Sequence, residues 1–448
     1  MRFMEIEKGS KAWVVGADMG YGHLRAVYAL KHLAEEGIIT AGVDDGASVS
    51  EKKLWSRVMR TYAAFSRASS VPLIGRPLFN LLDRIQRIPP IVPGRDLARP
   101  TFQLGLLEGL LSHGLCAGML EKIRTNHLPL VTSFYATAIA AERANYHHTY
   151  CIICDAEIHR VWVARSPGES HIVYFAPCEQ AVERLRAYGV PQERIYLTGF
   201  PLPDELIGGR ELSTLKRNFG RRLRRLDPEG KFLDRSKSLQ IPRGEKFEQG
   251  ADHPLTITYA VGGAGAQKEI GEEIARSLAP HLAARSIKLN LVAGLNAKVH
   301  NFFSTVKTSM APGSNSIEII YGRDFEKYFD RFNAILHETD ILWTKPSELS
   351  FYAALGLPII MSPPLGSQEE YNRRWLLDVG AGINQKDPAQ TAFWLIDMLE
   401  TGALAQAAFA GYSNVRKRGT YAIGEILETG ELSEAESLIP PSERILFP

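Results

Sequence analysis

The 448-residue sequence has little cysteine, no long apolar run and almost no excess of one charge. Its four cysteines are too few for a disulfide scaffold in so long a chain, and they fit a reducing compartment. No stretch reaches the ~18 consecutive apolar residues of a membrane-spanning helix. The nearest candidate, 104–120, is interrupted by Glu108 and His113. Lysine and arginine number 52 against 50 acidic residues, so net charge does not select nucleic acid as a partner.

The remaining composition is that of a globular protein. Hydrophobic residues make up 45% and charged residues 23%, which excludes disordered, collagen-like and coiled-coil chains. The first eight residues include Glu5 and Glu7 and lack the apolar core of a signal peptide. We therefore expect a soluble cytoplasmic protein that can also lie peripherally on the inner face of a membrane.

The first half of the chain has the pattern of an α/β unit. The apolar run 11–16 predicts a buried strand, followed by a glycine-bearing loop at 18–23 and a helix over 24–36. Strand, glycine loop and helix in this order are typical of the start of a doubly wound domain. Further strands are predicted at 128–133, 150–154, 172–176 and 195–198, with helices at 136–143 and 179–188.

The second half repeats this pattern. The second half opens with a strand at 255–261, a glycine loop at Gly262–Gly265 and a helix at 268–278. Strands are then predicted at 288–292, 317–320, 341–343 and 358–361. Two glycine loops, each after the first strand of its half, predict an α/β fold of two Rossmann-like domains that face a cleft.

Two segments interrupt the alternation of strands and helices and set the expected domain boundaries. Residues 48–99 are rich in aromatic and basic residues, and 216–248 contain eleven Lys or Arg against five acids. Both would suit an anionic membrane surface, although packed helices and a solvated loop are the simpler interpretations. The expected division is 1–200 (N-terminal domain, with 48–99 irregular), 201–254 (basic linker or insertion), 255–425 (C-terminal domain) and 426–448 (tail).

The first loop places a histidine at a helix N-terminus. His23 follows Gly20 and Gly22 at the carboxyl end of the first strand, the edge where open α/β sheets bind ligands. The positive end of the helix dipole disfavours the imidazolium, so His23 should be neutral and able to act as a general base. A helix-capping role is the alternative.

The second loop suits an anion. Its small residues let backbone N–H groups approach a phosphate at the following helix N-terminus. The sequence Val261-Gly262-Gly263-Ala264-Gly265 matches neither a Walker A motif nor the dinucleotide-binding fingerprint, which disfavours kinases and dehydrogenases. A tight strand–helix turn is the alternative interpretation.

A third group of polar residues follows a predicted buried strand. Asp155, Glu157 and His159 lie within five residues, but no second cluster completes a metal site at ligand spacing. We therefore expect no bound metal and no cofactor. Cys151 and Cys154 fall in an apolar strand and are interpreted as core or neutral positions, not as redox or zinc groups.

Taken in order, these segments resemble the GT-B glycosyltransferases of the monogalactosyldiacylglycerol synthase and processive diacylglycerol glucosyltransferase family. The peptidoglycan lipid II N-acetylglucosaminyltransferase is a more distant likeness. Residues 20–26 look like the family's Gly-x-Gly-His-x-Arg-Ala loop, and 155–162 look like its Asp-x-x-x-His-x-x-Trp segment. The resemblance runs from about residue 11 to 424 and also covers 174–179, 189–201, 262–266, 344–346, 354–358 and 368–372.

The resemblance implies transfer of a hexose from a nucleotide sugar, with UDP as the expected nucleotide, to a lipid or other hydroxyl. It implies a nucleotide-sugar donor and a lipid acceptor at an anionic membrane surface as partners, and no nucleic acid. The implied catalytic residues are His23 and Asp155 as bases, with His159 in support. The implied donor-binding residues are Gly262, Gly263, Ala264, Gly265, Lys345, Glu348, Gln368 and Glu369, and the implied acceptor-loop residues are Gly20, Gly22, Arg25 and Trp162.

One segment departs from the family pattern. Family members usually have Lys-Pro-Gly-Gly and a later Glu for the nucleotide ribose, whereas this chain has Lys345-Pro346-Ser347-Glu348 with Phe351 where that Glu is expected. Glu348 lies one helical turn earlier and is the candidate replacement. Two alternatives therefore stay open: a sugar-nucleotide 2-epimerase on the same scaffold, and a catalytically silent nucleotide-sugar-binding protein.

Overall fold

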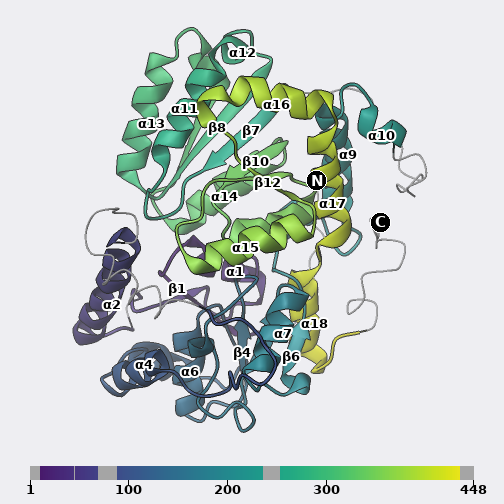
Figure 1. The fold of residues 1–448 in the computed structure, drawn as a ribbon. Coiled ribbons are helices and arrows are strands. Elements are labelled where there is room, and N and C mark those ends of the chain that lie inside the picture. Colours follow the sequence, from purple (N-terminus) through teal and green to yellow (C-terminus); the bar gives the residue numbers. More distant parts are fainter. Residues whose placement is uncertain (1–10, 45, 69–87, 236–252, 434–448) are drawn as a thin grey trace. The chain divides into compact units, whose positions relative to one another are not determined.

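A computed structural model describes residues 11–44, 46–68, 88–235 and 253–433 (Figure 1). The chain divides into two compact units. Of the described residues, unit 1 comprises those within Met1–Leu202, Leu365–Gln368 and Arg418–Leu438, and unit 2 comprises those within Pro203–Pro364 and Glu369–Lys417. Each unit is built on one parallel six-stranded sheet.

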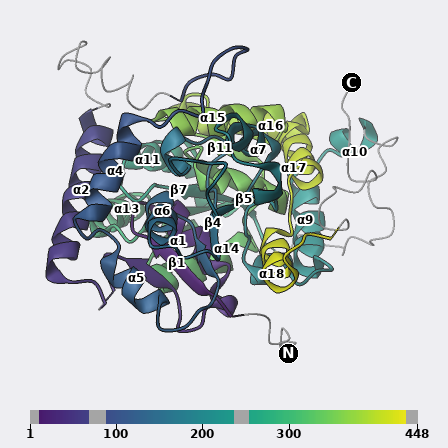
Figure 2. The same cartoon turned by 90° about the horizontal axis from the view of Figure 1, so that it is seen from below.

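The sheet of unit 1 has the strand order β2-β1-β3-β4-β5-β6. Its strands are β1 (Trp13–Ala17), β2 (Ile39–Ala41), β3 (Leu130–Thr132), β4 (Thr149–Ile152), β5 (Val173–Ala176) and β6 (Ile195–Leu197). Its helices are α1 (Tyr21–Tyr28), α2 (Val49–Ala68), α4 (Phe102–Ser112), α5 (Ala117–Ile123), α6 (Tyr135–Arg143), α7 (Glu179–Ala187) and α18 (Gly419–Thr429), with short 3₁₀ turns at Lys31–Leu33, Arg160–Trp162 and Gln192–Arg194. Helices α2, α4 and α5 carry the darker colours of the early chain in Figure 2.

The sheet of unit 2 has the strand order β12-β11-β10-β7-β8-β9. Its strands are β7 (Leu255–Ala260), β8 (Ile287–Gly294), β9 (Ile317–Tyr321), β10 (Ile341–Thr344), β11 (Ile359–Met361) and β12 (Gly382–Asn384). Its helices are α8 (Asp204–Ile207), α9 (Ser213–Leu226), α10 (Lys231–Arg235), α11 (Lys268–Ser277), α12 (Ala279–Ala283), α13 (Ala297–Ser309), α14 (Phe325–Leu336), α15 (Ser367–Asp378, whose first two residues fall in unit 1), α16 (Thr391–Glu400) and α17 (Ala403–Asn414), with 3₁₀ segments at Gly313–Ser316, Glu348–Leu355 and Pro388–Gln390.

The predicted α/β class with two doubly wound sheets is confirmed. The central strands are buried and apolar, as expected of parallel strands covered by helices on both faces: Trp13, Val14 and Val15 are at most 1% exposed. The sequence analysis missed the three-residue edge strands β2 and β12. The cleft between the two domains stays a prediction.

The segment expected as a basic linker contributes to the core of unit 2 in its described part. Helix α9 buries Phe219, Leu223 and Leu226, and α10 buries Phe232 in the same apolar cluster as β7 and β8. Unit 2 thus begins near residue 203, whereas the sequence analysis placed the start of the C-terminal domain at 255. Residues 236–252 of that linker lie outside the described residues, as do 69–87 of the 48–99 region and 434–448 of the tail.

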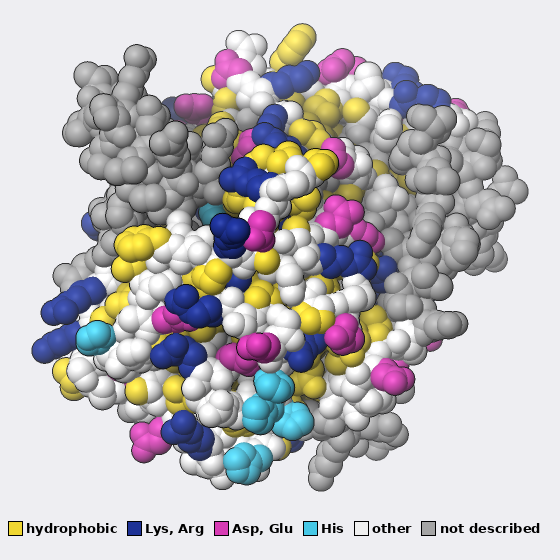
Figure 3. Space-filling view, turned by 60° about the horizontal axis from the view of Figure 1, so that its bottom comes forward, with side chains coloured by type: hydrophobic (Ala, Val, Ile, Leu, Met, Phe, Trp, Pro, Cys, Tyr) yellow, Lys and Arg dark blue, Asp and Glu magenta, His cyan; other side chains and the backbone are white. Residues whose placement is uncertain are grey.

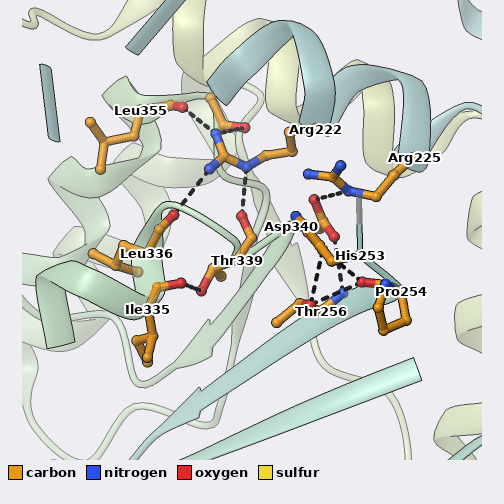
Figure 4. Close-up of polar contacts among 11 residues, drawn as sticks. Arg222, Arg225, His253, Pro254, Thr256, Ile335, Leu336, Thr339, Asp340 and Leu355 are labelled. Carbon is orange, nitrogen blue, oxygen red and sulfur yellow. Dashed lines mark hydrogen bonds and ion pairs between the residues drawn. The ribbon is translucent and has the colours of Figure 1, made fainter. Parts of the chain in front are cut away.

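Two arginines of this segment are buried structural groups (Figure 4). Arg222 is 2% exposed and donates to the carbonyl oxygens of Thr339 at 2.8 Å and Leu355 at 2.6 Å. Arg225 pairs at 2.8 Å with the fully buried carboxylate of Asp340, whose other oxygen accepts from the backbone N–H of Thr256 at 2.9 Å. Burial lowers the pKa of Arg222 to about 10, so the side chain stays charged at neutral pH.

The chain returns to unit 1 at its described C-terminal end. The hydroxyl of Thr420 donates to the carbonyl oxygen of Leu202 at 2.5 Å. The hydroxyl of Tyr196 donates to the carbonyl oxygen of Gly430 at 2.8 Å. A Cβ on Gly419 would lie 2.5 Å from the carbonyl oxygen of Phe200, so only glycine permits this approach. Residues 418–433 therefore belong to unit 1, whereas the expected C-terminal domain ran to 425.

Within the described ranges, no helix is long and apolar enough to cross a membrane. The first part of the 48–99 region is the regular helix α2, not irregular chain.

Candidate functional site

The candidate base His23 is fixed by two reciprocal hydrogen bonds in unit 1. Its ring Nδ1 lies 2.7 Å from the carbonyl oxygen of Ser133, and the hydroxyl of Ser133 donates to the carbonyl oxygen of His23 at 2.7 Å. His23 lies in the first turn of α1, after β1, and Ser133 directly follows β3, the neighbour of β1. Because a carbonyl oxygen only accepts, Nδ1 carries the proton, and in the neutral ring Nε2 carries the lone pair. This is the tautomer that a general base at Nε2 requires.

Aromatic side chains surround this imidazole. Its ring centroid lies 5.0 Å from that of Phe134 and 6.0 Å from that of Trp162. Trp162 is 3% exposed and also contacts Tyr135, with ring centroids 5.2 Å apart. The predicted acceptor-side residue Trp162 is therefore brought to His23, 139 positions earlier in the chain.

Asp155 comes to the same edge of the sheet. Adjacent strands β1, β3 and β4 are parallel, so their carboxyl ends lie together. The thiol of Cys154 lies 3.8 Å from the carbonyl oxygen of Ser133, the group that also holds His23. Asp155 is the next residue and is partly exposed. That Asp155 and His23 share one substrate hydroxyl stays a prediction.

The neighbouring acid Glu157 is committed to a buried ion pair. Its carboxylate binds the guanidinium of Arg184 through contacts of 2.5 and 2.8 Å, with both side chains at most 3% exposed. Burial, assisted by the positive charge of Arg184, lowers the pKa of His159 to about 4. His159 is therefore neutral at physiological pH, which suits the supporting role predicted for it.

All four cysteines are buried thiols, and burial raises the pKa of Cys178 to about 12.

The predicted acceptor-loop residues differ in their surroundings. Gly20 is exposed and precedes α1 with φ +123°, a conformation that side chains rarely adopt. Gly22 is half-buried in the first turn of α1. Arg25 is 1% exposed, so it is part of the interior of unit 1 and not an exposed acceptor contact.

The glycine loop of unit 2 lies between β7 and α11, as predicted. The backbone N–H of Gly265 donates to the carbonyl oxygen of Gly262 at 2.8 Å, and Gly265 has φ +75°. Gly263 and Ala264, between them, are exposed. Helix α11 begins at Lys268, so the loop precedes the positive end of a ten-residue helix.

Lys345 lies directly against this loop. A Cβ on Gly262 would lie 2.7 Å from Cε of Lys345, so the missing side chain makes room for the lysine. The ammonium of Lys345 forms an ion pair with Glu369 of α15. One turn later, the side chain of Asn372 donates to the carbonyl oxygen of Pro346 at 3.2 Å. Gly262, Lys345 and Glu369, three predicted donor residues, thus converge in unit 2 at the carboxyl ends of the paired strands β7 and β10.

The remaining donor candidates lie close by in sequence. Glu348 is 8% exposed and opens the 3₁₀ segment Glu348–Leu355, while Gln368 precedes Glu369 in the first turn of α15. Phe351 is 1% exposed, with its ring 4.7 Å from that of Trp375. The position where the family carries its ribose Glu is thus a core position in this chain.

The sequence analysis missed Asn296. A Cβ on Gly265 would lie 2.7 Å from its Nδ2 atom, and its Oδ1 caps α13 by accepting from the N–H of Lys298 at 3.0 Å. The signal was present, because an Asn between a strand and a helix is a typical N-cap. Among the residues that the structure describes, no cluster of His, Cys, Asp or Glu could hold a metal ion.

Two doubly wound units, each with a loop and a following helix at the carboxyl edge of its parallel sheet, define an α/β protein of two Rossmann-like units. Its sequence is distantly similar to glycosyltransferases. It is 22% identical over 240 residues to a processive diacylglycerol β-glucosyltransferase of Bacillus licheniformis, a match that covers 52% of this chain and 50% of that protein. The enzyme of the same description from Bacillus subtilis is 19% identical over 237 residues, with the same two coverages. The chain spans about half the length of the curated relatives it matches.

No protein-family model matches the chain. Among solved structures, a UDP-GlcNAc 2-epimerase from Neisseria meningitidis bound to UDP-GlcNAc is 11% identical, with a TM-score of 0.48 and coverage of 93% of this chain and 99% of that one. The spinosyn rhamnosyltransferase SpnG is also 11% identical, with a TM-score of 0.41 and the same coverages. These two likenesses are too weak to extend a ligand or an activity to this chain.

The low pKa of His159 predicts a pH-dependent stability. The folded protein resists protonating His159 down to about pH 4, whereas the unfolded chain takes up that proton near pH 6.5. The unfolded state binds more protons in this window, so acidification from pH 6.5 to 4 should lower the free energy of unfolding by roughly 3 kcal/mol through this group. His159→Gln should flatten that part of the profile, measured by urea unfolding at several pH values. The exposed His148→Gln is the matched control, and an unchanged profile in His159→Gln would contradict the assignment.

Proposed function

We propose that this protein is a glycosyltransferase that moves a hexose from a nucleotide sugar, with UDP as the nucleotide, to a hydroxyl of a lipid or other acceptor. The observation that carries the proposal is the contact of Lys345 with the Gly262 loop ahead of α11. This arrangement offers an ammonium group, exposed loop backbone and a helix N-terminus to one anion. The distant similarity to processive diacylglycerol β-glucosyltransferases supports the hexose and the lipid hydroxyl.

In this proposal unit 2 binds the donor. The diphosphate lies over Gly263 and Ala264, where side chains are absent or short, and Lys345 neutralises part of its charge. Glu369 holds the lysine in place, and Glu348 accepts a hydrogen bond from the ribose. As the bond between the anomeric carbon and the diphosphate breaks, the loop and the α11 dipole stabilise the charge on the leaving nucleoside diphosphate.

Unit 1 activates the acceptor. The acceptor oxygen forms its bond to the anomeric carbon while its proton moves to Nε2 of His23. The carbonyl oxygen of Ser133, bonded to Nδ1–H, keeps the imidazole in the required tautomer. Asp155 serves as the second base candidate, and neutral His159 supports the segment that carries it.

One experiment separates the proposal from its two alternatives. UDP-glucose, UDP-galactose and UDP-GlcNAc are each incubated with the protein, with and without diacylglycerol. UDP release that requires the lipid, with formation of a glycolipid, supports the transferase. Conversion of UDP-GlcNAc to its 2-epimer without lipid identifies an epimerase. Binding of the nucleotide sugars without any turnover identifies a silent binding protein.

The donor loop gives the first test of this proposal. Gly263→Val should abolish nucleotide-sugar binding in calorimetry, because its branched side chain occupies the space where the diphosphate approaches the backbone. Circular dichroism should show an unchanged fold. Gly168→Val is the matched control, since Gly168 is exposed in unit 1 and a Cβ there meets nothing within 4 Å. Wild-type affinity in a folded Gly263→Val variant would refute the donor assignment.

The base gives a second test. His23→Ala and Asp155→Asn should each lower turnover by about 10²–10⁴-fold, the usual loss with a positioned base. Donor affinity should change little, because both residues belong to unit 1, whereas Gly262, Lys345 and Glu369 belong to unit 2. Turnover is measured as nucleoside diphosphate release at saturating donor. Normal turnover in both variants would show that neither His23 nor Asp155 is the base.

A membrane surface is the proposed location of the lipid acceptor. Helix α4 exposes Phe102 to 74% and Leu106 to 54%, one turn apart. Lysine and arginine are interspersed with acidic residues on the face that Figure 3 shows, Arg222 is buried, and Arg225 is paired with Asp340. We therefore assign the larger contribution to apolar contact and a smaller one to the charge of anionic lipid.

The double variant Phe102→Ser/Leu106→Ser should bind vesicles with anionic lipid more weakly by about 10²-fold or more, because burying each of the two apolar side chains is worth ~1.5–3 kcal/mol. Co-sedimentation at moderate salt measures the partition coefficient. Phe393→Ser is the control, since Phe393 is 79% exposed on α16 of unit 2. Equal partitioning of all three proteins would remove α4 from the membrane contact.

A further inference from the structure

The glycine loop of unit 2 leads into α11 through a residue with an unusual backbone. Gln267, the residue before α11, has φ +65° and ψ 20°, the left-handed region that residues other than Gly, Asn and Asp rarely adopt. This conformation costs free energy at a residue with a Cβ, and such residues cluster at functional sites. Glycine would avoid the cost. The side chain of Gln267 should therefore contribute something that glycine cannot.

The side chain of Gln267 ties this end of the loop to the segment after β11. Its Nε2–H donates to the carbonyl oxygen of Pro363 at 2.8 Å. The backbone carbonyl oxygen of Gln267 accepts from the hydroxyl of Tyr259, a residue of β7, at 2.5 Å. Gln267 is therefore bonded to two parts of the carboxyl edge of the sheet, once through its side chain and once through its backbone.

Tyr259 is a rigid support for this arrangement. It is 1% exposed, and its ring centroid lies 6.3 Å from that of Trp343 on β10. A Cβ on Gly271 of α11 would lie 2.9 Å from the tyrosine ring, so the glycine lets the helix lie directly on it. Burial raises the pKa of the Tyr259 hydroxyl, which therefore keeps its proton and donates to Gln267.

The other end of the loop is attached to the same part of the chain. Gly262 lies against Lys345, and Lys345 forms its ion pair with Glu369 in the first turn of α15. Pro363, the partner of Gln267, lies in the connection from β11 to α15. Both ends of the glycine loop are thus bonded to the chain that leads from β11 into α15.

The loop between these two attachments offers backbone groups to a ligand. Gly263 and Ala264 are exposed. In the described chain, the side chain of the N-cap Gln267 makes no hydrogen bond to α11, so it does not cover the N–H groups of the first turn. Such groups bind an anion best when they are held in place beforehand, because ordering a loop on binding lowers affinity.

We propose that Gln267 is a positioning residue for the phosphates of the nucleotide sugar. The inference rests on the proposed function and adds to its donor side a residue that acts through the loop. The bond to Pro363 holds the loop and the start of α11 in the shape that receives the diphosphate. The costly backbone conformation is retained because glycine would lose that bond. Loss of the bond weakens binding of the phosphates and leaves binding of the nucleoside unchanged.

Gln267→Met tests this inference, because methionine keeps the length of the side chain and the backbone cost but lacks the N–H donor. Ligand-observed NMR titrations of the full-length protein measure its affinity for UDP and for uridine. UDP affinity should fall about two- to tenfold, the usual effect of losing one neutral hydrogen bond, whereas uridine affinity should stay the same. Gln406→Met is the matched control, since Gln406 is exposed on α17 of the same unit.

Gln267→Gly separates the hydrogen bond from the backbone conformation. Glycine adopts this φ without steric cost, so the variant should unfold at no lower temperature than Gln267→Met and yet bind UDP no better. Thermal unfolding and the same titrations measure both quantities. A purely structural role predicts instead that UDP affinity follows the unfolding temperature.

The outcomes distinguish this inference from the proposed function. Loss of UDP affinity in both Gln267 variants, with uridine affinity and Gln406→Met unchanged, supports the inference. Wild-type UDP affinity in either variant, or equal loss of UDP and uridine, overturns it even if lipid-dependent UDP release is normal. Selective loss of UDP affinity in a protein that transfers no sugar supports the positioning role and removes the proposed function. A wild-type protein that binds neither UDP nor uridine overturns both.

Discussion

Parallel strand pairing is the constraint on which both candidate sites depend. In unit 1 it brings the ends of β1, β3 and β4 to one edge, so that His23, Ser133 and Cys154 meet although 131 positions separate the first from the last. In unit 2 the same geometry brings the loop after β7 to the segment after β10. Helices on both faces leave the carboxyl edge as the place where loops can offer polar groups. Both sites are therefore assembled from short loops on a rigid apolar sheet.

Buried charge plays a supporting part in each unit. Glu157 and Arg184 pair inside unit 1, next to the segment that carries Asp155 and His159. Arg225 and Asp340 pair inside unit 2, and Arg222 ties α9 to the carbonyl groups around β10. Removing one partner of such a pair typically costs more than the pair contributes, because the remaining charge stays buried. These groups therefore fix the positions of loops and helices and are withdrawn from binding at the surface.

The fold could be predicted further than the site. Apolar runs predicted the order of most strands, because buried parallel strands have a composition that is visible in sequence. The boundaries could not be derived, since the apolar stripe of α9 is masked by its arginines, and nothing local shows that Gly419 packs on Phe200. The sequence analysis named the glycine loop and Lys345 as candidates, but it did not predict that they are in contact. Their contact, the Ser133 carbonyl on His23 and the cap at Asn296 depend on packing between distant segments.

The return of α18 to unit 1 has a consequence for how the chain can be divided. Because unit 1 takes residues from both sides of unit 2, the polypeptide passes from one unit to the other at residues 202–203 and again at 417–418, apart from the short return to unit 1 at Leu365–Gln368. Unit 2 can be expressed as a nearly continuous stretch, but unit 1 cannot. A fragment that stops at residue 202 exposes the carbonyl groups that Gly419 and Thr420 cover. An isolated unit 1 therefore requires segment 418–433, which contains α18, to be joined to it by an artificial linker or supplied as a separate peptide.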